Sequence, residues 1–481
     1  TQIIPLRMGL AYLALWALRP KTMKLPWKDE LMFILIGITG GSFYFFLQNT
    51  ASAHTSAANV SILVSMSPIL TVILAQLFSR RGEKLGKWVY IGAVVAIAGV
   101  VMVVLNGTLS FHLSPLGDLL ALAAAAIVYL AGQFLSMREV EPIYPGPGVT
   151  EIKMLSDWYP GLEGTAGDTE VYVLEGEQEG DSMLVLGGTH PNEPSGLVAA
   201  VLLIENAQPE AGTLYVIPRT NNSAFTCTDP QEGAPMRFTI DTPNGERWFR
   251  FGSRATNPIH QWPDPEIYVH ASSGQRLSGS ETRNINRSYP GRTDGTFTEK
   301  MSYGVTQLIE QEGIDITVDL HEASPEYPTI NTIVAHQDAL SLGSQALINM
   351  QLEGMSIGLE PSPENLHGLT HRELGDYTDT LALLMETSNP SQGRLRGKTD
   401  ENLVVTGQDK YYLKAAGYGR LYDFGYDADG APISERVARH VTGVAQFAVA
   451  FNELGLGNLV INGIPSYVDM AADIGQFLAP D

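Results

Sequence analysis

Cysteine is almost absent from this sequence, because Cys227 is the single cysteine among 481 residues. One cysteine excludes a disulfide within the chain and suits a reducing compartment. We expect Cys227 to be a structural thiol rather than a nucleophile.

Charged residues are absent from three long stretches of the first part of the chain. Residues 31–79, 88–117 and 119–137 contain no Asp, Glu, Lys or Arg. Uncharged runs of this kind are typical of membrane spans. A soluble core would instead need five consecutive helices that are apolar on every side. The sequence therefore predicts an all-α transmembrane helix bundle of about five spans in residues 1–137, near 3–18, 31–48, 58–79, 88–106 and 118–137.

The two parts of the chain differ in the sign of their charge. Residues 1–137 hold nine Lys or Arg against four Asp or Glu, a net charge of +5. Residues 138–481 carry a net charge of −27, which gives the whole chain −22. An acidic surface of this size argues against nucleic-acid binding.

The positive charge of the first part lies in two connections, Arg19 to Lys28 and Arg80 to Lys87, and the connections near 49–57 and 107–117 carry none. The positive-inside rule places both basic connections in the cytoplasm. The fifth span then runs inward. We expect a multi-pass protein of the inner or plasma membrane whose later residues lie in the cytoplasm.

A proline-rich stretch at 138–149 predicts a linker. Beyond it, residues 150–481 alternate short apolar strands with amphipathic helices, which favours an α/β domain whose mixed sheet is covered by helices on both faces. The expected strands are Glu170–Leu174, Met183–Leu186, Thr213–Ile217, Asp315–Leu320 and Leu381–Met385. The expected helices are 196–206, 298–311 and 433–453.

A possible metal site begins at residues 187–196, Gly-Gly-Thr-His-Pro-Asn-Glu-Pro-Ser-Gly. His190 and Glu193 lie on a turn between an expected strand and an expected helix. An imidazole and a carboxylate at this spacing can hold one cation, and two His with one Glu form a ligand set of catalytic zinc. The alternative is a turn whose Glu193 caps the helix.

A second His lies at the end of another buried strand, Ile314-Asp315-Ile316-Thr317-Val318-Asp319-Leu320-His321-Glu322. Ligands gather beyond the carboxyl ends of strands in such sheets, so His321 can complete the set. Residue 325 is Pro, which excludes the H-E-x-x-H helix of another zinc class. Glu322 either supports a ligand or is exposed.

Two further stretches carry polar groups that suit catalysis. Asn286 and Arg287, in Arg283-Asn284-Ile285-Asn286-Arg287-Ser288, can hold a substrate carboxylate, since Arg offers a planar fork of donors. Glu386 ends the apolar run Thr380-Leu381-Ala382-Leu383-Leu384-Met385, where loss of solvent raises a carboxyl pKa toward that of a general base. A solvated turn and a paired structural Glu are the respective alternatives.

The four stretches together resemble the M14-type zinc carboxypeptidase superfamily, with the nearest likeness to its succinylglutamate desuccinylase/aspartoacylase branch, over roughly residues 150–475. The resemblance implies one zinc ion per chain on His190, Glu193 and His321. It also implies a substrate carboxylate on Asn286 and Arg287, and Glu386 as the base. The arginine that polarises the scissile carbonyl in this family corresponds to Arg283 or Arg276.

The first part of the chain resembles the EamA-type module of the drug/metabolite transporter superfamily. The residues that carry this likeness are Tyr44-Phe45-Phe46-Leu47-Gln48-Asn49, Thr55-Ser56-Ala57-Ala58-Asn59-Val60-Ser61, Ser67-Pro68-Ile69-Leu70-Thr71, Gly82-Glu83-Lys84-Leu85 and Leu116-Gly117-Asp118-Leu119-Leu120-Ala121-Leu122. Family members have about ten spans in two repeats. The resemblance implies half a transport pathway and a truncated or fused gene product.

The sequence thus predicts a zinc hydrolase, tethered to membrane lipid by its N-terminal helices, that cleaves an amide or ester in a small N-acylated substrate bearing a carboxylate. Two alternatives stay open. One is a zinc carboxypeptidase acting on peptides, and the other is a transporter component whose soluble domain binds ligand without turnover. A homo-oligomer also remains open.

Overall fold

The computed structural model describes residues 47, 50–51, 139–229 and 233–479. The chain divides into two compact units, Thr1–Glu139 and Val140–Asp481. The five expected spans lie outside the described residues except for Leu47, and the described Thr50 and Ala51 fall between the second and third spans. Among the described residues, none of the helices has the length and apolar character that crossing a membrane requires.

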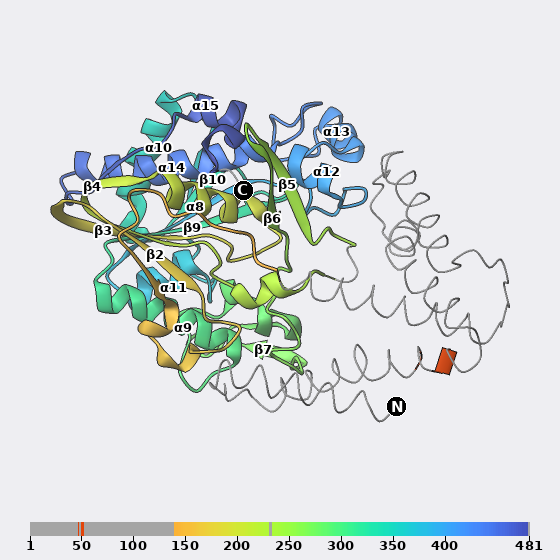
Figure 1. The fold of residues 1–481 in the computed structure, drawn as a ribbon, viewed down its shortest axis with the longest axis horizontal. Helices are drawn as coiled ribbons and strands as arrows, with labels where there is room; N and C mark the ends of the chain where they lie inside the picture. Colours follow the sequence, from red (N-terminus) through yellow and green to blue (C-terminus); the bar gives the residue numbers. More distant parts are fainter. Residues whose placement is uncertain (1–46, 48–49, 52–138, 230–232, 480–481) are drawn as a thin grey trace, which may run out of the picture. The chain divides into compact units, whose positions relative to one another are not determined.

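A mixed nine-stranded sheet forms the centre of the C-terminal unit (Figure 1). Its order is β1 (Glu151–Met154), β2 (Glu170–Glu175), β4 (Gln208–Ile217), β3 (Gln178–Leu186), β9 (Ile316–Ala323), β12 (Leu381–Ser388), β10 (Thr332–Ala335) and β11 (Gly358–Pro361), with β13 (Val460–Asn462) beside β4. The central strands β4, β3, β9 and β12 are parallel, whereas β10 is antiparallel to β12. The mixed sheet predicted from the sequence is confirmed.

Helices cover both faces of this sheet. One face packs against α8 (Pro194–Asn206), α10 (Leu340–Leu352) and α14 (Ile433–Glu453), and the other against α9 (Phe297–Glu312) and α11 (Thr370–Tyr377) (Figure 1). Successive strand residues face opposite sides, so Met183 and Val185 of β3 join the first core, and Leu184 and Leu186 join the second. Each side of β3 is therefore buried, which explains its continuous apolar run.

The remaining elements lie in connections that the sequence left without an assigned structure. Residues 225–280 form two hairpins, and residues 387–432 form two short helices. These elements are β5 (Arg237–Thr242), β6 (Gly245–Arg250), β7 (Ile267–Val269), β8 (Arg276–Ser278), α12 (Glu401–Thr406) and α13 (Lys410–Gly417), and α15 (Tyr467–Ala472) follows near the C-terminus. The 3-10 helices are η2 (Leu155–Asp157), η3 (Pro160–Leu162), η4 (Asn222–Thr226), η5 (Gly279–Arg283), η6 (Ile285–Arg287), η7 (Gln337–Ala339) and η8 (Ile474–Phe477).

The stretch expected to be a linker packs on the C-terminal unit from Val140 onward. Glu141 is buried, and Arg219 Nε donates to its Oε1 at 2.6 Å. The backbone nitrogen of Gly146 donates to the carbonyl of Ile204 in α8 at 3.1 Å. Residues 140–148 therefore belong to the folded unit, because their polar groups find buried partners there.

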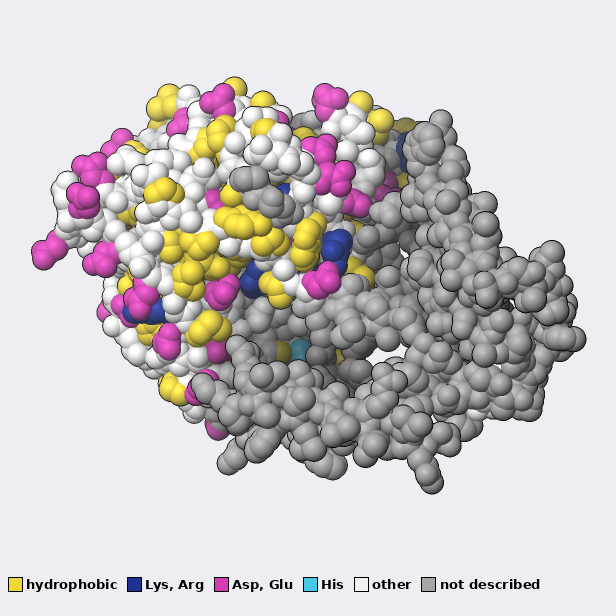
Figure 2. Space-filling model, viewed as in Figure 1, with side chains coloured by type: hydrophobic (Ala, Val, Ile, Leu, Met, Phe, Trp, Pro, Cys, Tyr) yellow, Lys and Arg dark blue, Asp and Glu magenta, His cyan; other side chains and the backbone are white. Residues whose placement is uncertain are grey.

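The surface of the C-terminal unit is acidic, as the composition predicts. Asp and Glu side chains are spread over the described part of the face in Figure 2, with few Lys or Arg among them.

The single cysteine, Cys227, is half-buried, and burial raises the pKa of its thiol to about 11. A thiol of this kind stays protonated near neutral pH, in keeping with a structural role.

Candidate active site

The turn between β3 and α8 depends on two glycines. Gly188 has φ +60°, and a Cβ there would lie 2.7 Å from the Phe225 ring. A Cβ at Gly196 would lie 2.6 Å from the carbonyl oxygen of Leu320 in β9. Glycine therefore allows the turn its left-handed residue and lets α8 approach β9, which ends at His321.

His190, Glu193 and His321 meet at the carboxyl ends of β3 and β9. One donor atom from each lies within 4.8 Å of the others, and all three residues are buried. Nδ1 of His190 is 2.8 Å from Glu193 Oε1, and Nδ1 of His321 is 2.8 Å from Glu193 Oε2. The three residues that the sequence singled out are thus brought together as one potential ligand set.

The outer nitrogens of both rings are held by other side chains. His190 Nε2 lies 2.8 Å from Asn284 Oδ1, and His321 Nε2 lies 2.8 Å from Asp319 Oδ2. Both partners accept, so each Nε2 carries a hydrogen when its ring is neutral, and the Nδ1 lone pair turns toward Glu193. With both rings neutral, the two Nδ1 lone pairs and the Glu193 carboxylate point toward one another, an arrangement that can bind a metal cation.

The electrostatics of the trio lead to the same requirement. Burial disfavours ionisation of Glu193, yet His190 and His321 hold its pKa well below the usual range. Burial also opposes protonation of His321, but the carboxylates of Asp319 and Glu193 raise its pKa well above normal. His190 has its pKa lowered to about 4, first by burial and then by Arg254. The lowered pKa of Glu193 and the raised pKa of His321 both favour positive charge beside the Glu193 carboxylate, and two His with one Glu form a ligand set of zinc.

Glu386 lies beside this cluster. It is the register partner of His321 between the parallel strands β12 and β9, so both side chains point to the same side of the sheet. Its Oε2 is buried and has no hydrogen-bond partner in the described part of the chain. Burial raises its pKa to about 8, against the opposing effect of His321. A carboxyl group with a pKa near neutral and an oxygen that makes no hydrogen bond is suited to proton transfer.

Asn286 and Arg287 also reach the site. Both line the same cavity, from the short helix η6. The amide of Asn286 is fixed by the Thr370 backbone nitrogen at 2.9 Å and lies 3.3 Å from His321 Nε2. Nη1 of Arg287 donates to the Asn286 carbonyl at 2.7 Å. The pair is therefore held by its neighbours and is not a solvated turn.

The structure places Arg283 and Arg276 elsewhere. Arg283 forms a forked pair with Asp264 at 2.7 and 2.9 Å, and it does not line the cavity. Arg276 is exposed on β8. Arg254 lines the cavity instead, and its Nη1 lies 2.9 Å from Glu193 Oε1. No motif marks Arg254, because the fold brings it to the site from the long segment 225–280.

Glu322 has a supporting role and is not exposed. Its Oε1 accepts from Arg436 Nη1 at 2.7 Å and its Oε2 from Asn389 Nδ2 at 3.0 Å. The backbone nitrogen of Glu322 donates to Glu193 Oε2 at 3.0 Å. Glu322 therefore fixes the end of β9 against α14, while its main chain positions Glu193.

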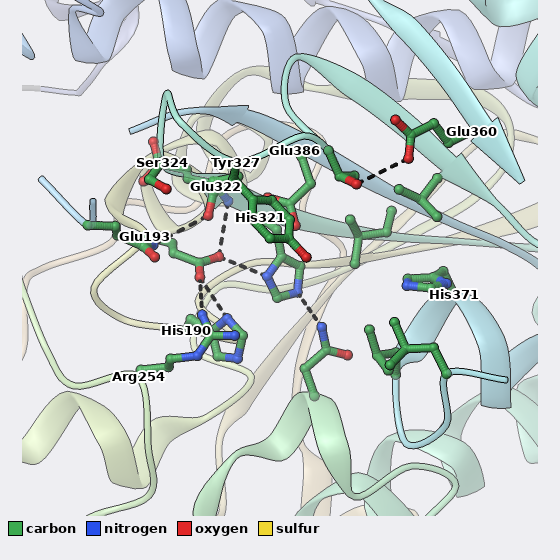
Figure 3. Close-up of a pocket in the computed structure, with 18 of the residues that line it drawn as sticks. His190, Glu193, Arg254, His321, Glu322, Ser324, Tyr327, Glu360, His371 and Glu386 are labelled. Carbon is green, nitrogen blue, oxygen red and sulfur yellow. Dashed lines mark hydrogen bonds and ion pairs between the residues drawn. The ribbon is translucent and has the colours of Figure 1, made fainter. Parts of the chain in front are cut away.

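One cavity of about 670 Å³ is lined by the trio, by Glu322 and Glu386, and by Arg254, Asn286 and Arg287. Figure 3 shows His190, Glu193 and His321 gathered on one side, with Arg254 beside His190, Glu386 near His321, and His371 and Glu360 away from the trio. A volume of this size accommodates a small organic substrate.

Comparison with known proteins locates two families in different parts of the chain. The model of the EamA-like transporter family matches residues 3–105, which confirms the resemblance of that segment. The probable terminal-alkyne amino-acid exporter of Streptantibioticus cattleyicolor is 33% identical over 112 residues, covering 23% of this chain and 35% of the exporter. The chain thus spans about a third of the length of this curated relative.

Solved structures similar to this chain include two named hydrolases. A succinylglutamate desuccinylase/aspartoacylase from Rhodobacter sphaeroides has 18% identity, with coverage of 46% of this chain and 51% of that one and a TM-score of 0.28. A metallo-carboxypeptidase from Burkholderia cenocepacia has 11% identity, coverage of 68% and 69%, and a TM-score of 0.35.

Proposed function

We propose that the C-terminal unit is a zinc-dependent hydrolase that removes an acyl group from a small N-acylated, amino-acid-like substrate. One observation supports this most strongly: the ligand set of His190, Glu193 and His321 shares a cavity with Glu386, a carboxyl group of raised pKa and one unoccupied oxygen. This combination serves hydrolysis, because water must lose a proton as it attacks a carbonyl.

In the proposed mechanism, His190, Glu193 and His321 would hold one zinc ion. Zinc at such a site polarises a carbonyl and lowers the pKa of water. Glu386 accepts a proton from the attacking water and donates it to the leaving nitrogen. Its neighbour His321 keeps its ring orientation through Asp319, whose other oxygen accepts from Thr189 Oγ1 at 2.7 Å.

Two arginines would divide the recognition of the substrate. Arg287, with Asn286, grips the carboxylate, since guanidinium and carboxylate match in planar geometry. Arg254 takes the role that the family resemblance left to Arg283 or Arg276, because its guanidinium lies in the cavity beside Glu193. There it stabilises the negative charge that develops on the carbonyl oxygen.

We also propose that the EamA-like segment anchors this unit to the inner or plasma membrane, with the hydrolase in the cytoplasm. The match of residues 3–105 and the alternation of basic and uncharged connections support this topology. A reporter fused after Arg138 should then show cytoplasmic activity, and periplasmic activity would reverse the topology.

Hydrolysis assays on the full chain test the proposed activity. The purified chain is offered N-acyl amino acids, their esters and short peptides, with zinc and with a chelator. We expect zinc-dependent release of free amino acid from small N-acyl amino acids. Preference for peptides would identify a carboxypeptidase. Binding without any turnover would identify a ligand-binding domain and contradict the proposal.

A further inference from the structure

The cavity continues beyond the trio along an apolar floor. Leu384 is two residues before Glu386 on β12, and Val334 is its register partner on β10. Both line the cavity. Residues two apart on a strand are separated by roughly 7 Å and share a face. The floor therefore runs roughly 7 Å along β12 from Glu386 and then roughly 5 Å across to β10, away from the proposed reaction centre.

A carboxylate stands at the end of this floor. Glu360 on β11 is the register partner of Val334, lines the cavity and lies far from the trio in Figure 3. Thr329 Oγ1 donates to its Oε2 at 3.1 Å. Within the described residues, no Lys, Arg or His makes an ion pair with Glu360. Its negative charge is thus available to a ligand.

A buried histidine adds a neutral partner to the same end. His371 of α11 lines the cavity, and its Nδ1 lies 2.8 Å from Ser362 Oγ. Its Nε2 has no protein partner in the described part of the chain. Burial lowers the pKa of His371 to about 3, so the ring is uncharged at neutral pH. It can take part in a hydrogen bond without repelling a cation.

The two ends of the cavity therefore differ in charge. Arg254 and Arg287 provide positive charge beside the trio, whereas Glu360 provides negative charge beyond the apolar floor. Resting on the proposed function, we propose that the cavity selects an amino acid with a basic side chain. Its α-carboxylate binds Arg287, its methylenes lie on Leu384 and Val334, and its terminal ammonium group binds Glu360.

This pairing excludes a second class of ligand. An acidic side chain over the same floor would place its carboxylate against Glu360, where like charges repel. A neutral side chain of equal length would keep the apolar contact but leave Glu360 unpaired. The order of preference is therefore basic, then neutral, then acidic.

Binding and turnover measured on the same full chain test the inference separately from the proposed function. Calorimetry with free L-lysine, L-norleucine and L-glutamate requires no reaction. We expect L-lysine to bind more tightly than L-norleucine by roughly 5- to 50-fold, the range of one charge-assisted hydrogen bond in a partly solvated site. The kcat/KM values of their Nα-acetyl derivatives should follow the same order.

The variant Glu360→Gln removes the charge and keeps the shape of the side chain. It should abolish the advantage of lysine over norleucine, and Glu360→Lys should move the preference to glutamate. Glu364→Gln is the matched control, because Glu364 is exposed and does not line the cavity. It should behave as wild type.

The possible failures are distinguishable. Lysine preference in binding without hydrolysis of any acyl derivative would overturn the proposed function and leave the subsite standing. Hydrolysis with equal or reversed preference, or a preference that survives Glu360→Gln, would overturn the subsite alone.

Discussion

Helix α8 has a buried carboxylate at each end, and the two have different partners. Glu193 precedes its first turn and Glu205 lies in its last turn. Glu193 faces two imidazole rings and the cavity. Glu205 faces Arg247, whose Nη1 and Nη2 approach its two oxygens at 2.8 and 2.6 Å.

The partners of the two carboxylates differ in whether they can lose a proton. Imidazole nitrogens can release a proton and bind a metal near neutral pH, whereas a guanidinium stays protonated. Arg247 is fully buried and also donates to the carbonyls of Pro142 and Ala479. We call Glu205, Arg247 and these two carbonyls the clamp. Burial alone therefore does not indicate function, but burial beside exchangeable partners and an open cavity does.

The largest expected effect concerns Glu386, on the functional side of this comparison. Glu386→Gln keeps the shape and removes the proton acceptor, so turnover should fall by roughly 10²- to 10⁴-fold, the usual contribution of general-base catalysis. Metal content and substrate binding should persist. Activity within about threefold of wild type would place the base elsewhere. Loss of zinc would make Glu386 a ligand.

The clamp should show the opposite pattern. Arg247→Met leaves Glu205 buried without its cation, which should lower the free energy of unfolding by about 3–5 kcal/mol. Zinc content per folded chain should be unchanged. Denaturant titration followed by tryptophan fluorescence measures the loss, with exposed Arg420→Met as the control. Adding Glu205→Gln should restore part of the stability, and no restoration would contradict the paired-charge explanation.

A smaller loss of activity is expected at Arg287, and it tests whether this residue binds substrate or only supports the fold. Arg287→Ala should reduce kcat/KM for an N-acyl amino acid by about 10- to 100-fold, because one charge-assisted contact is lost. The methyl ester of the same substrate should be affected far less. Arg292→Ala, an exposed arginine outside the cavity lining, is the control. Equal losses on acid and ester would make Arg287 structural.

The smallest predicted effect is a pH dependence from His371. Its folded pKa is about 3 against 6.5 as the ordinary value, so the unfolded chain takes up a proton first as the pH falls. Stability is therefore lost as the pH drops below about 6.5, by about 2 kcal/mol between pH 7 and pH 5. His371→Gln should reduce this pH-dependent loss in chelator-treated protein. An unchanged slope would mean that His371 protonates in the folded state.

The sequence predicted the elements of the C-terminal unit where an apolar run was continuous or a helical pattern was long. The expected strands at 183–186 and 315–320 became β3 and β9, and the helix at 433–453 became α14. The short strands β10 and β11 were missed because residues typical of turns stand next to them or within them: Asn331 precedes β10, and Gly358 and Pro361 are the two ends of β11. They matter here because they carry Val334 and Glu360.

Some residues of the candidate site could also be predicted from the sequence, and others could not. The positions of His190, Glu193, His321 and Glu386 could be named because each ends an apolar run or lies on a turn beside one. Arg254 could not be named, since it lies in an irregular segment and reaches Glu193 only through tertiary folding. The partner of the His190 ring, Asn284, was likewise set by tertiary packing, whereas Asp319 lies two residues before His321 on β9 and so shares its face of the strand.

The central claim is that the functional end of α8 holds a metal ion and the clamp end does not. Elemental analysis of the purified full chain measures this directly. We predict about one zinc per chain in wild type and in Arg247→Met, and almost none in His190→Ala or His321→Ala, whose three-ligand set is broken. Undiminished zinc in both histidine variants, with folding intact, would contradict the account.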